Sequence, residues 1–317
     1  MAHGGTLNAL SLTLCALLHA LCAVSLMLGT DQEATGLLEL KHGIVELYRK
    51  VATSLPSDIE KELKKAHEIE DEGIAKEAMK VVLENITLAR KTSRPVCQDT
   101  GVPTFFVGIP QQLSQKELRE IIVVATREAT EKVPLRPNAV DILTDKNSGD
   151  NTGRNIPVIY FEETDEHVLT IDLMLKGSGC ENAGQIYKLP AEDINAQRDL
   201  DGVRKCIIDT VFKAQGRGCP PYTLGVGIGA TKDQVSVLAK RQLLGRVDER
   251  DGDEEIRALQ VRLLDELNQL GIGPLGFGGK TTVIGVNIDY NHRHPASYFV
   301  DVSVCCWANR RGRLVWG

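Results

Sequence analysis

Three cysteines lie far apart in the sequence, each in or close to a motif that favours a tight turn or carries groups able to bind an anion. Cys97 is part of Arg-Pro-Val-Cys-Gln-Asp-Thr-Gly, Cys219 lies between Gly-Arg-Gly and Pro-Pro, and Cys306 follows His-Arg-His-Pro-Ala-Ser by a short predicted strand. A buried structural cysteine usually lies within an apolar periodic run instead. If these thiols converge, three distant segments must return to one point, which strongly constrains the fold.

Converging thiolates can hold a metal centre. Three of them could bind an iron–sulfur cluster and leave one iron without a protein ligand. An open iron is a Lewis acid, which favours an enzyme. Structural zinc held by cysteine and histidine is the alternative, although the chain has no Cys-x-x-Cys pair. His292, Arg293 and His294 fit anion binding or proton transfer better than zinc ligation.

Other cysteines have simpler interpretations. Cys206 lies in a helical pattern and is expected in the core. Cys305 and Cys306 are adjacent on a predicted strand, so their side chains should point to opposite faces and only one can reach a given site. Cys180 lies in a glycine-rich loop that either presents backbone N–H groups to a carboxylate or phosphate or forms a tight turn. The Cys97 motif, taken alone, also fits an ordinary helix-to-strand turn.

Charge and cysteine content restrict the partners and the compartment. The net charge of −6 comes without a basic stripe, which argues against nucleic acid. Eight irregularly spaced cysteines in 317 residues indicate a reducing cytoplasm rather than a secreted disulfide framework. Positive charge is instead placed beside the glycine- and proline-rich motifs, as binding of small dicarboxylates requires: Arg94, Arg136, Lys176, Arg217 and Arg293.

The N-terminal region is a separate problem. Residues 7–28 contain no charged side chain, and such a run is long enough for a membrane helix or a signal-peptide core. The six residues before it carry no Lys or Arg, which both kinds of signal normally have. We therefore expect residues 1–33 to be a leader or a misassigned extension, with Met27 as the native start, and residues 34–317 to form the functional domain without a membrane partner.

Hydrophobic periodicity and turn signals predict a single compact α/β domain with a mixed sheet and N-terminal helices. Helices are expected within 37–91 and over 114–132, 203–214 and 231–244, and strands over 103–109, 158–162, 167–175, 222–228, 281–289 and 298–307. Ser57 with Glu60 and Ser114 with Glu117 form predicted capping boxes. Nucleotide binding is not expected, because Pro274 occupies the first glycine position of a P-loop.

Seven motifs in a fixed order carry a resemblance. They are Cys97-Gln-Asp-Thr-Gly, Leu135-Arg-Pro-Asn, Asn151-Thr-Gly, Lys176-Gly-Ser-Gly, Cys219-Pro-Pro, Gly278-Gly-Lys, and Arg293-His-Pro-Ala-Ser through Cys306-Trp-Ala. From about Leu37 to the C-terminus, the chain resembles the α subunit of the iron–sulfur (class I) fumarate hydratases and L(+)-tartrate dehydratases.

The resemblance implies a [4Fe–4S] cluster held by Cys97, Cys219 and Cys306. It also implies a β subunit that completes the active site with further arginines, a lysine and a threonine base. Family members often have Ser or Ala where this chain has Cys180. Of the residues implied to contact the substrate, Asp99 and His294 are the catalytic candidates; the full set is Gln98, Asp99, Arg136, Lys176, Gly177, Cys180, Glu181, Asn182 and His294.

The implied reaction is the reversible hydration of fumarate to (S)-malate, as in the tricarboxylic acid cycle. The dehydration of L(+)-tartrate to oxaloacetate is the alternative. Lys176 with Glu181-Asn182 favours fumarate hydratase, whereas the Gly-Ser-Gly-Cys loop and the Cys-Trp-Ala-Asn-Arg-Arg-Gly ending favour tartrate dehydratase. Two alternatives from other classes are a non-catalytic zinc module and a scaffold that only positions a β subunit.

Overall fold

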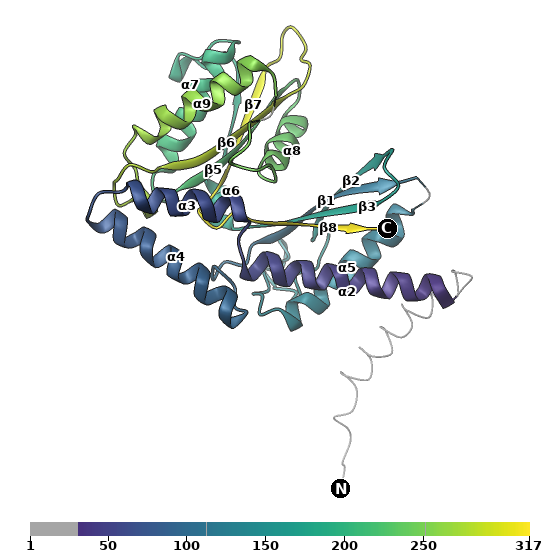
Figure 1. Cartoon of the computed structure of the whole chain (residues 1–317). Helices are drawn as coiled ribbons and strands as arrows, with labels where there is room; N and C mark the ends of the chain where they lie inside the picture. Colours follow the sequence, from purple (N-terminus) through teal and green to yellow (C-terminus); the bar gives the residue numbers. More distant parts are fainter. Residues whose placement is uncertain (1–30, 112, 251) are drawn as a thin grey trace.

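Two four-stranded sheets organise the computed structural model, which describes residues 31–111, 113–250 and 252–317 (Figure 1). Each sheet contains parallel and antiparallel pairs, so the predicted α/β class with mixed strand pairing is confirmed. The first sheet has the order β2 (Val158–Thr164), β1 (Val102–Pro110), β3 (Leu169–Lys176) and β8 (Arg310–Trp316). The second has the order β4 (Gln185–Lys188), β7 (Phe299–Cys305), β5 (Tyr222–Gly229) and β6 (Val283–Tyr290).

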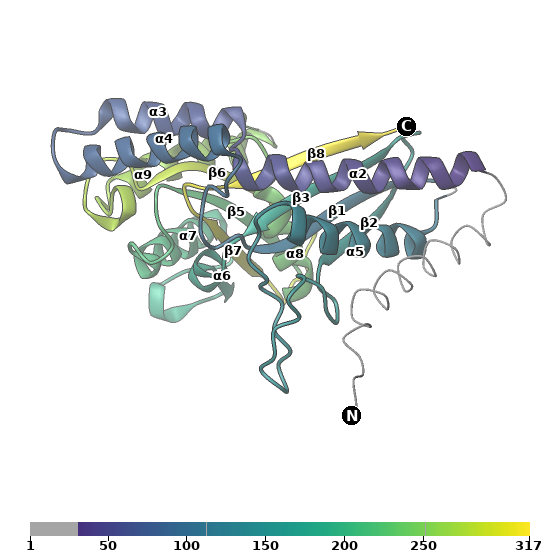
Figure 2. The same ribbon diagram turned by 90° about the horizontal axis from the view of Figure 1, so that it is seen from below.

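The first sheet is packed against two helices, α2 (Asp31–Thr53) and α5 (Gln115–Lys132), as Figures 1 and 2 show. Tyr48 of α2 meets the ring of Phe105 edge-on at 5.7 Å, and its hydroxyl lies 2.8 Å from the Thr126 hydroxyl of α5. Ser114 caps α5 by accepting the N–H of Glu117, as the sequence predicts. These contacts fix β1, and with it the Cys97 loop that precedes the strand.

The second sheet has helices on both faces. α7 (Leu200–Ala214) and α9 (Glu254–Asn268) share one apolar core with it, and α8 (Lys232–Gln242) covers the other face (Figure 1). Glycines in β5 allow α8 to approach the strand backbone closely. A Cβ at Gly225 would lie 2.1 Å from the carbonyl oxygen of Ala239, and one at Gly227 would lie 2.3 Å from that of Val235. This contact explains the Gly-x-Gly-x-Gly pattern of the strand.

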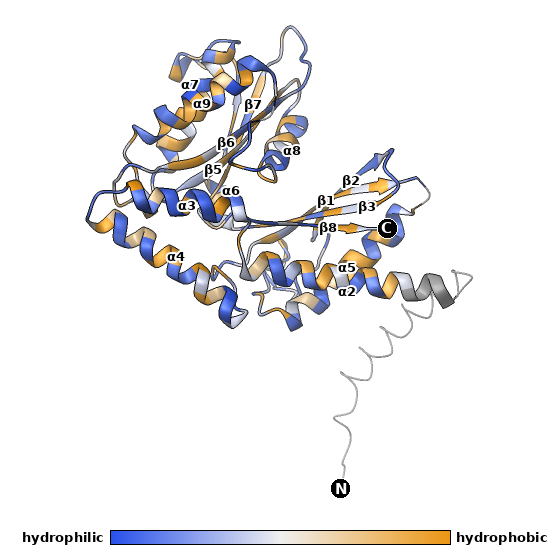
Figure 3. Ribbon diagram, in the orientation of Figure 1, coloured by the Kyte–Doolittle hydropathy of each residue, from blue (hydrophilic) through white to orange (hydrophobic). Residues whose placement is uncertain are grey.

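A pair of helices, α3 (Ser57–Ile69) and α4 (Ile74–Thr92), shares a core with β6 of the second sheet and with the segment between β7 and β8 (Figure 2). Hydrophobic and hydrophilic residues alternate along them, as expected of helices with one buried face (Figure 3). The predicted capping box at Ser57 is wrong, because Ser57 is already helical and Pro56 holds the N-cap without a side-chain bond.

Shorter elements complete the fold: α6 (Ser178–Ala183), η1 (Glu192–Ile194) and η2 (Pro274–Gly276). Glu70 accepts the N–H groups of Lys280 and Thr281, so the backbone donors of the Gly-Gly-Lys loop bind this carboxylate rather than a phosphate. Among the described residues, none of the helices combines the length and the apolar character needed to cross a membrane. The apolar segment predicted over residues 7–28 lies outside the described residues.

Candidate metal centre

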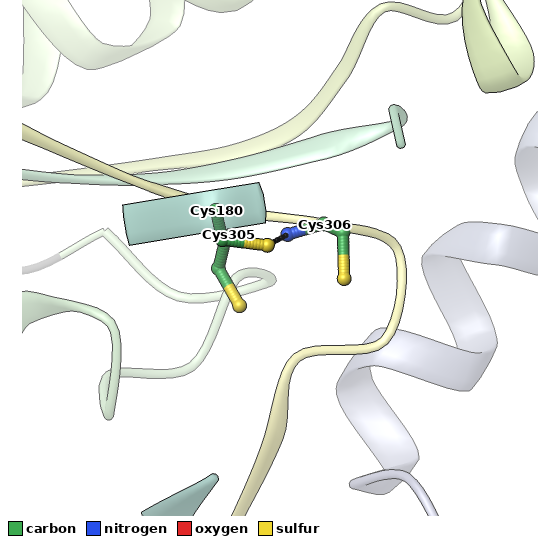
Figure 4. A group of neighbouring side chains, drawn as sticks. All are labelled: Cys180, Cys305 and Cys306. Carbon is green, nitrogen blue, oxygen red and sulfur yellow. Dashed lines mark hydrogen bonds between the residues drawn. The ribbon is translucent and has the colours of Figure 1, made fainter. Parts of the chain in front are cut away.

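Three buried thiols meet where the chain leaves the second sheet for the first. Cys180 of α6, Cys305 at the end of β7 and Cys306 have Sγ atoms within 4.8 Å of one another (Figure 4). The Cys306 N–H donates to the Cys180 Sγ at 3.2 Å, and the Cys180 thiol lies 3.9 Å from the Gly218 carbonyl oxygen. Contact with Cys180, followed by burial, raises the pKa of the Cys306 thiol. A metal cation that binds Cys306 would therefore have to displace the proton of this thiol.

Cys219, a second predicted ligand, lies beside the segment that carries Cys306. The Trp307 N–H donates to the Cys219 carbonyl oxygen at 3.2 Å, which places Cys219 directly beside the segment of Cys306. Cys219 has a positive φ of 58° and an exposed side chain. The thiol is enclosed only in part, and this partial burial, followed by the charge of Cys97, raises the pKa of Cys219. Within the described part of the chain, the three thiols that lie within 4.8 Å of one another are those of Cys180, Cys305 and Cys306. Of the predicted ligands this group contains Cys306 but neither Cys97 nor Cys219, and Cys219 lies beside it through the backbone bond to Trp307.

The structure corrects the predicted placement of two further cysteines. β7 ends at Cys305, so the alternation of a regular strand does not extend to Cys306, and both thiols join one cluster. The expectation that only one of the pair can reach the site is therefore wrong. Cys180 is 4% exposed, and its sulfur accepts the Cys306 N–H. Its side chain belongs to the buried thiol cluster rather than to a surface open to substrate.

Asp99 connects the Cys97 loop to α6. Its carboxylate accepts the N–H of Gly101 at 2.9 Å, the N–H of Ser178 at 2.8 Å and the Ser178 hydroxyl at 3.2 Å. A Cβ on Gly177 would lie 2.8 Å from Asp99 Oδ2, so this contact requires glycine. Asp99 of the Cys-Gln-Asp-Thr-Gly motif therefore binds Ser178 of the Lys-Gly-Ser-Gly motif, and these hydrogen bonds fix the start of α6 relative to the Cys97 loop.

Arg136 has a fixed backbone and an exposed side chain. Its N–H donates to the Thr100 hydroxyl at 3.1 Å, and its carbonyl oxygen accepts from the Asn151 side chain at 3.0 Å. These bonds explain why the Leu-Arg-Pro-Asn and Asn-Thr-Gly motifs occur together. They hold the Arg136 backbone against Thr100, three residues after Cys97, and leave the guanidinium exposed.

Lys176 has its partners inside the chain. Its side chain is only 1% exposed, and Nζ donates to Glu181 Oε2 at 2.6 Å and to the Ser303 hydroxyl at 3.0 Å. Lys240 pairs with the other oxygen of Glu181. Burial opposes ionisation of Glu181, but the Lys176 charge holds its pKa below the usual value. These groups and Asp301 line a hollow of about 260 Å³. The arrangement favours a structural role for Lys176, in holding α6, over direct contact with a substrate.

Three further predicted substrate contacts are exposed, but only two of them lie close in sequence to the cysteines. Gln98 follows Cys97 directly, and Asn182 lies on α6 two residues after Cys180. His294 lies instead in the loop between β6 and β7, at the end of β7 opposite to Cys305. A strand of seven residues separates the two ends by roughly 20 Å. Within this chain the structure does not bring His294 to the thiols, because an extended strand lies between them.

One charged residue near the thiols was not predicted. Arg310 is 1% exposed, and its charge lowers the pKa of Cys306, against the larger effects that raise it. The only sequence signal is its position four residues after that cysteine, in Asn-Arg-Arg-Gly.

An α/β chain with a group of buried thiols, and with an aspartate bound to the helix that carries one of them, is typical of a metal-dependent enzyme. The comparisons agree with this class. The family model described as Fumarate hydratase (Fumerase) matches residues 41–315, and the chain belongs to this family.

Relatives differ in how much of their length the chain covers. It is 43% identical over 277 residues to a protein of Geobacillus stearothermophilus assigned by name as a class I fumarate hydratase, covering 86% of this chain and 54% of the relative. It thus spans about half the length of that relative. It is 38% identical to a Methanocaldococcus jannaschii protein assigned as the α subunit of L(+)-tartrate dehydratase, and the match covers 86% of this chain and 96% of that relative. The corresponding Escherichia coli K12 α subunit is 34% identical, with 84% and 86% covered.

Proposed function

We propose that this chain is the α subunit of a [4Fe–4S] hydro-lyase that hydrates fumarate reversibly to (S)-malate. The observation that carries the proposal is membership of the fumarate hydratase family. It is supported by the buried thiol group that contains Cys306 and by the hydrogen bond that holds Cys219 beside this segment, and we assign Cys97, Cys219 and Cys306 as the cluster ligands. The free thiols suit a reducing cytoplasm, where we place the protein.

The donor set fits an iron–sulfur cluster better than zinc. Structural zinc takes four ligands in a closed tetrahedral site, whereas these three cysteines include one, Cys219, with an exposed side chain. Thiolate sulfur is the usual ligand of iron–sulfur clusters, and three cysteines leave one iron open. When bound, the cluster would supply a Lewis acid for the C2 hydroxyl and one carboxylate of the substrate.

The side chains around the thiols have separate roles in this proposal. Arg136 grips a substrate carboxylate, since a guanidinium can donate two parallel hydrogen bonds. Gln98 and Asn182 add polar contacts near the ligands. Asp99 fixes α6 and assists a base on the partner chain that removes the C3 proton. Lys176 and Glu181 hold α6 in place, and Gly177 leaves room for Asp99. His294 has no role in this step within the chain.

A β subunit completes the active site in this proposal. Two relatives that the chain covers almost entirely are named as α subunits, and the longer Geobacillus relative has a segment beyond the matched part. Fumarate is preferred as substrate because that more similar relative carries the fumarate hydratase name. The names of the two α subunits favour L(+)-tartrate as the second candidate.

Metal analysis of anaerobically purified protein tests the proposal. We expect about four irons and four acid-labile sulfides per chain, lost in Cys306→Ala. Cys206→Ala is the matched control, because Cys206 packs in the α7 core and should leave the cluster intact. Zinc without sulfide in all three proteins would leave a structural metal module instead. Assays of the assembled complex with fumarate and with L(+)-tartrate then decide the substrate.

A further inference from the structure

Arg310 is the largest of the fully buried side chains in the described part of the molecule. Neither its Nε nor its NH1 has a hydrogen-bond partner within residues 31–111, 113–250 and 252–317. Burial of an unpaired charge is strongly unfavourable, and a buried guanidinium normally has an anion and further hydrogen bonds. An orphaned group of this kind therefore requires an explanation.

The neighbouring arginines make the contrast clear. Arg311 donates to both oxygens of Asp58, at 3.4 and 2.5 Å, and Arg313 donates to both oxygens of Asp172, at 2.7 and 2.8 Å. Three arginines thus lie within four residues of β8, and two of them have a carboxylate. The third, Arg310, lacks an ion-pair partner among the described residues.

Arg310 lies close to Cys306 along the chain. It lies four residues after Cys306, and its strand pairs with Leu175, the residue before Lys176. Cys306 is 9% exposed, whereas Cys219 is exposed. Arg310 is therefore enclosed by protein, while the open side of the thiol site lies at Cys219, where a substrate would arrive. A substrate carboxylate is thus a poor candidate for the missing anion.

We infer that Arg310 is the buried counter-cation of the thiolate-bound cluster, with its free N–H groups donating to sulfur. The inference rests on the proposed function, because the anion it requires is the cluster with its cysteine thiolates. Hydrogen bonds to sulfur and nearby positive charge stabilise a reduced cluster and tune its potential. Arg310 is then a positioning residue that acts through the cluster without touching substrate.

Two substitutions and one control test this role. Arg310→Met removes the charge and roughly keeps the volume, and Arg310→Lys restores a charge. Arg313→Met is the matched control, since it removes an exposed arginine from the same strand. The readouts are the rate of iron loss to a chelator under anaerobic conditions, the reduction potential of the cluster and the unfolding temperature of the metal-free protein.

We expect Arg310→Met to lose iron about 10- to 100-fold faster than wild type, at a more negative reduction potential, with partial recovery in Arg310→Lys. The metal-free Arg310→Met protein should be at least as stable as metal-free wild type, because the unpaired charge is gone. The inference would be overturned if Arg310→Met lost iron at the wild-type rate and its cluster had the wild-type reduction potential. A metal-free variant that is less stable than wild type would also overturn it, by indicating a structural role. Wild-type protein without iron and sulfide would instead refute the proposed function.

Discussion

The buried ion pair between Asp58 and Arg311 should be one of the strongest single determinants of stability in the α3 region. Both side chains are nearly inaccessible, at 2% and 6% exposure. Asp58 also accepts the Val247 N–H at 3.0 Å, and Arg311 also donates to the Gly245 carbonyl oxygen at 2.8 Å. Asp58→Asn leaves the Arg311 charge buried without compensation. Breaking such a pair from one side costs about 3–5 kcal/mol, so we expect a loss of this size in the free energy of unfolding.

Denaturant unfolding of the purified chain measures this loss. Asp172→Asn is the matched control, because its partner Arg313 is 62% exposed. A surface pair contributes about 0–1 kcal/mol, so the two variants should differ clearly. Equal losses in the two variants, or a loss below about 1 kcal/mol in Asp58→Asn, would refute the reasoning from burial.

The same pair predicts a pH dependence. Although burial alone would raise it, the Arg311 and Val247 hydrogen bonds hold the pKa of Asp58 below its usual value. A carboxyl group with a depressed pKa in the folded state stabilises the protein above its unfolded pKa, near 3.9, and loses that contribution as the pH falls through the folded value. Wild type should therefore lose more stability than Asp58→Asn as the pH falls below about 4. Parallel stability curves for the two proteins would contradict this assignment.

Three further substitutions test the site and the fold. Gly177→Ala places a Cβ 2.8 Å from Asp99 Oδ2, so it should displace α6 and lower the iron content of a still folded protein, as judged by circular dichroism. Arg136→Ala should cost about 2–5 kcal/mol of transition-state stabilisation, measured as kcat/KM of the assembled enzyme; an unchanged ratio would refute the carboxylate grip. Gly225→Ala should destabilise the chain by about 1–3 kcal/mol or more, because its Cβ would lie 2.1 Å from the Ala239 carbonyl oxygen; an unchanged unfolding midpoint would contradict this packing.

Local patterns predicted the elements better than their arrangement. Apolar periodicity and turn residues give most helices and strands, because those signals depend on neighbours in sequence. The division of the strands between two sheets depends on where the chain crosses after β7, and no local signal specifies that crossing. The paired thiols of Cys305 and Cys306 were missed for the same reason, since alternation holds only while the strand continues.

Residues of the site were predictable when their chemistry was visible in a motif. Cys97, Cys219 and Arg136 lie in turn-rich segments. In the structure the Cys219 segment binds that of Cys306, and the Arg136 backbone binds Thr100, three residues after Cys97. Arg310 could not be predicted in this way. Arg310 stands out because its buried guanidinium has N–H groups without a hydrogen-bond partner among the described residues, and only the three-dimensional structure reveals this.

Two sets of contacts hold α6 in place, and they change how the Gly-Ser-Gly-Cys loop is interpreted. Asp99 binds the N–H and hydroxyl of Ser178 at the start of the helix, and Lys176 and Lys240 bind Glu181 one turn later. Cys180 lies between these points, so its sulfur is held against the Cys306 N–H. A cysteine fixed in this way forms part of the buried thiol group and is not free to move with a bound substrate. Substitution of Cys180 should therefore affect cluster stability and oxidation more than the choice between fumarate and tartrate.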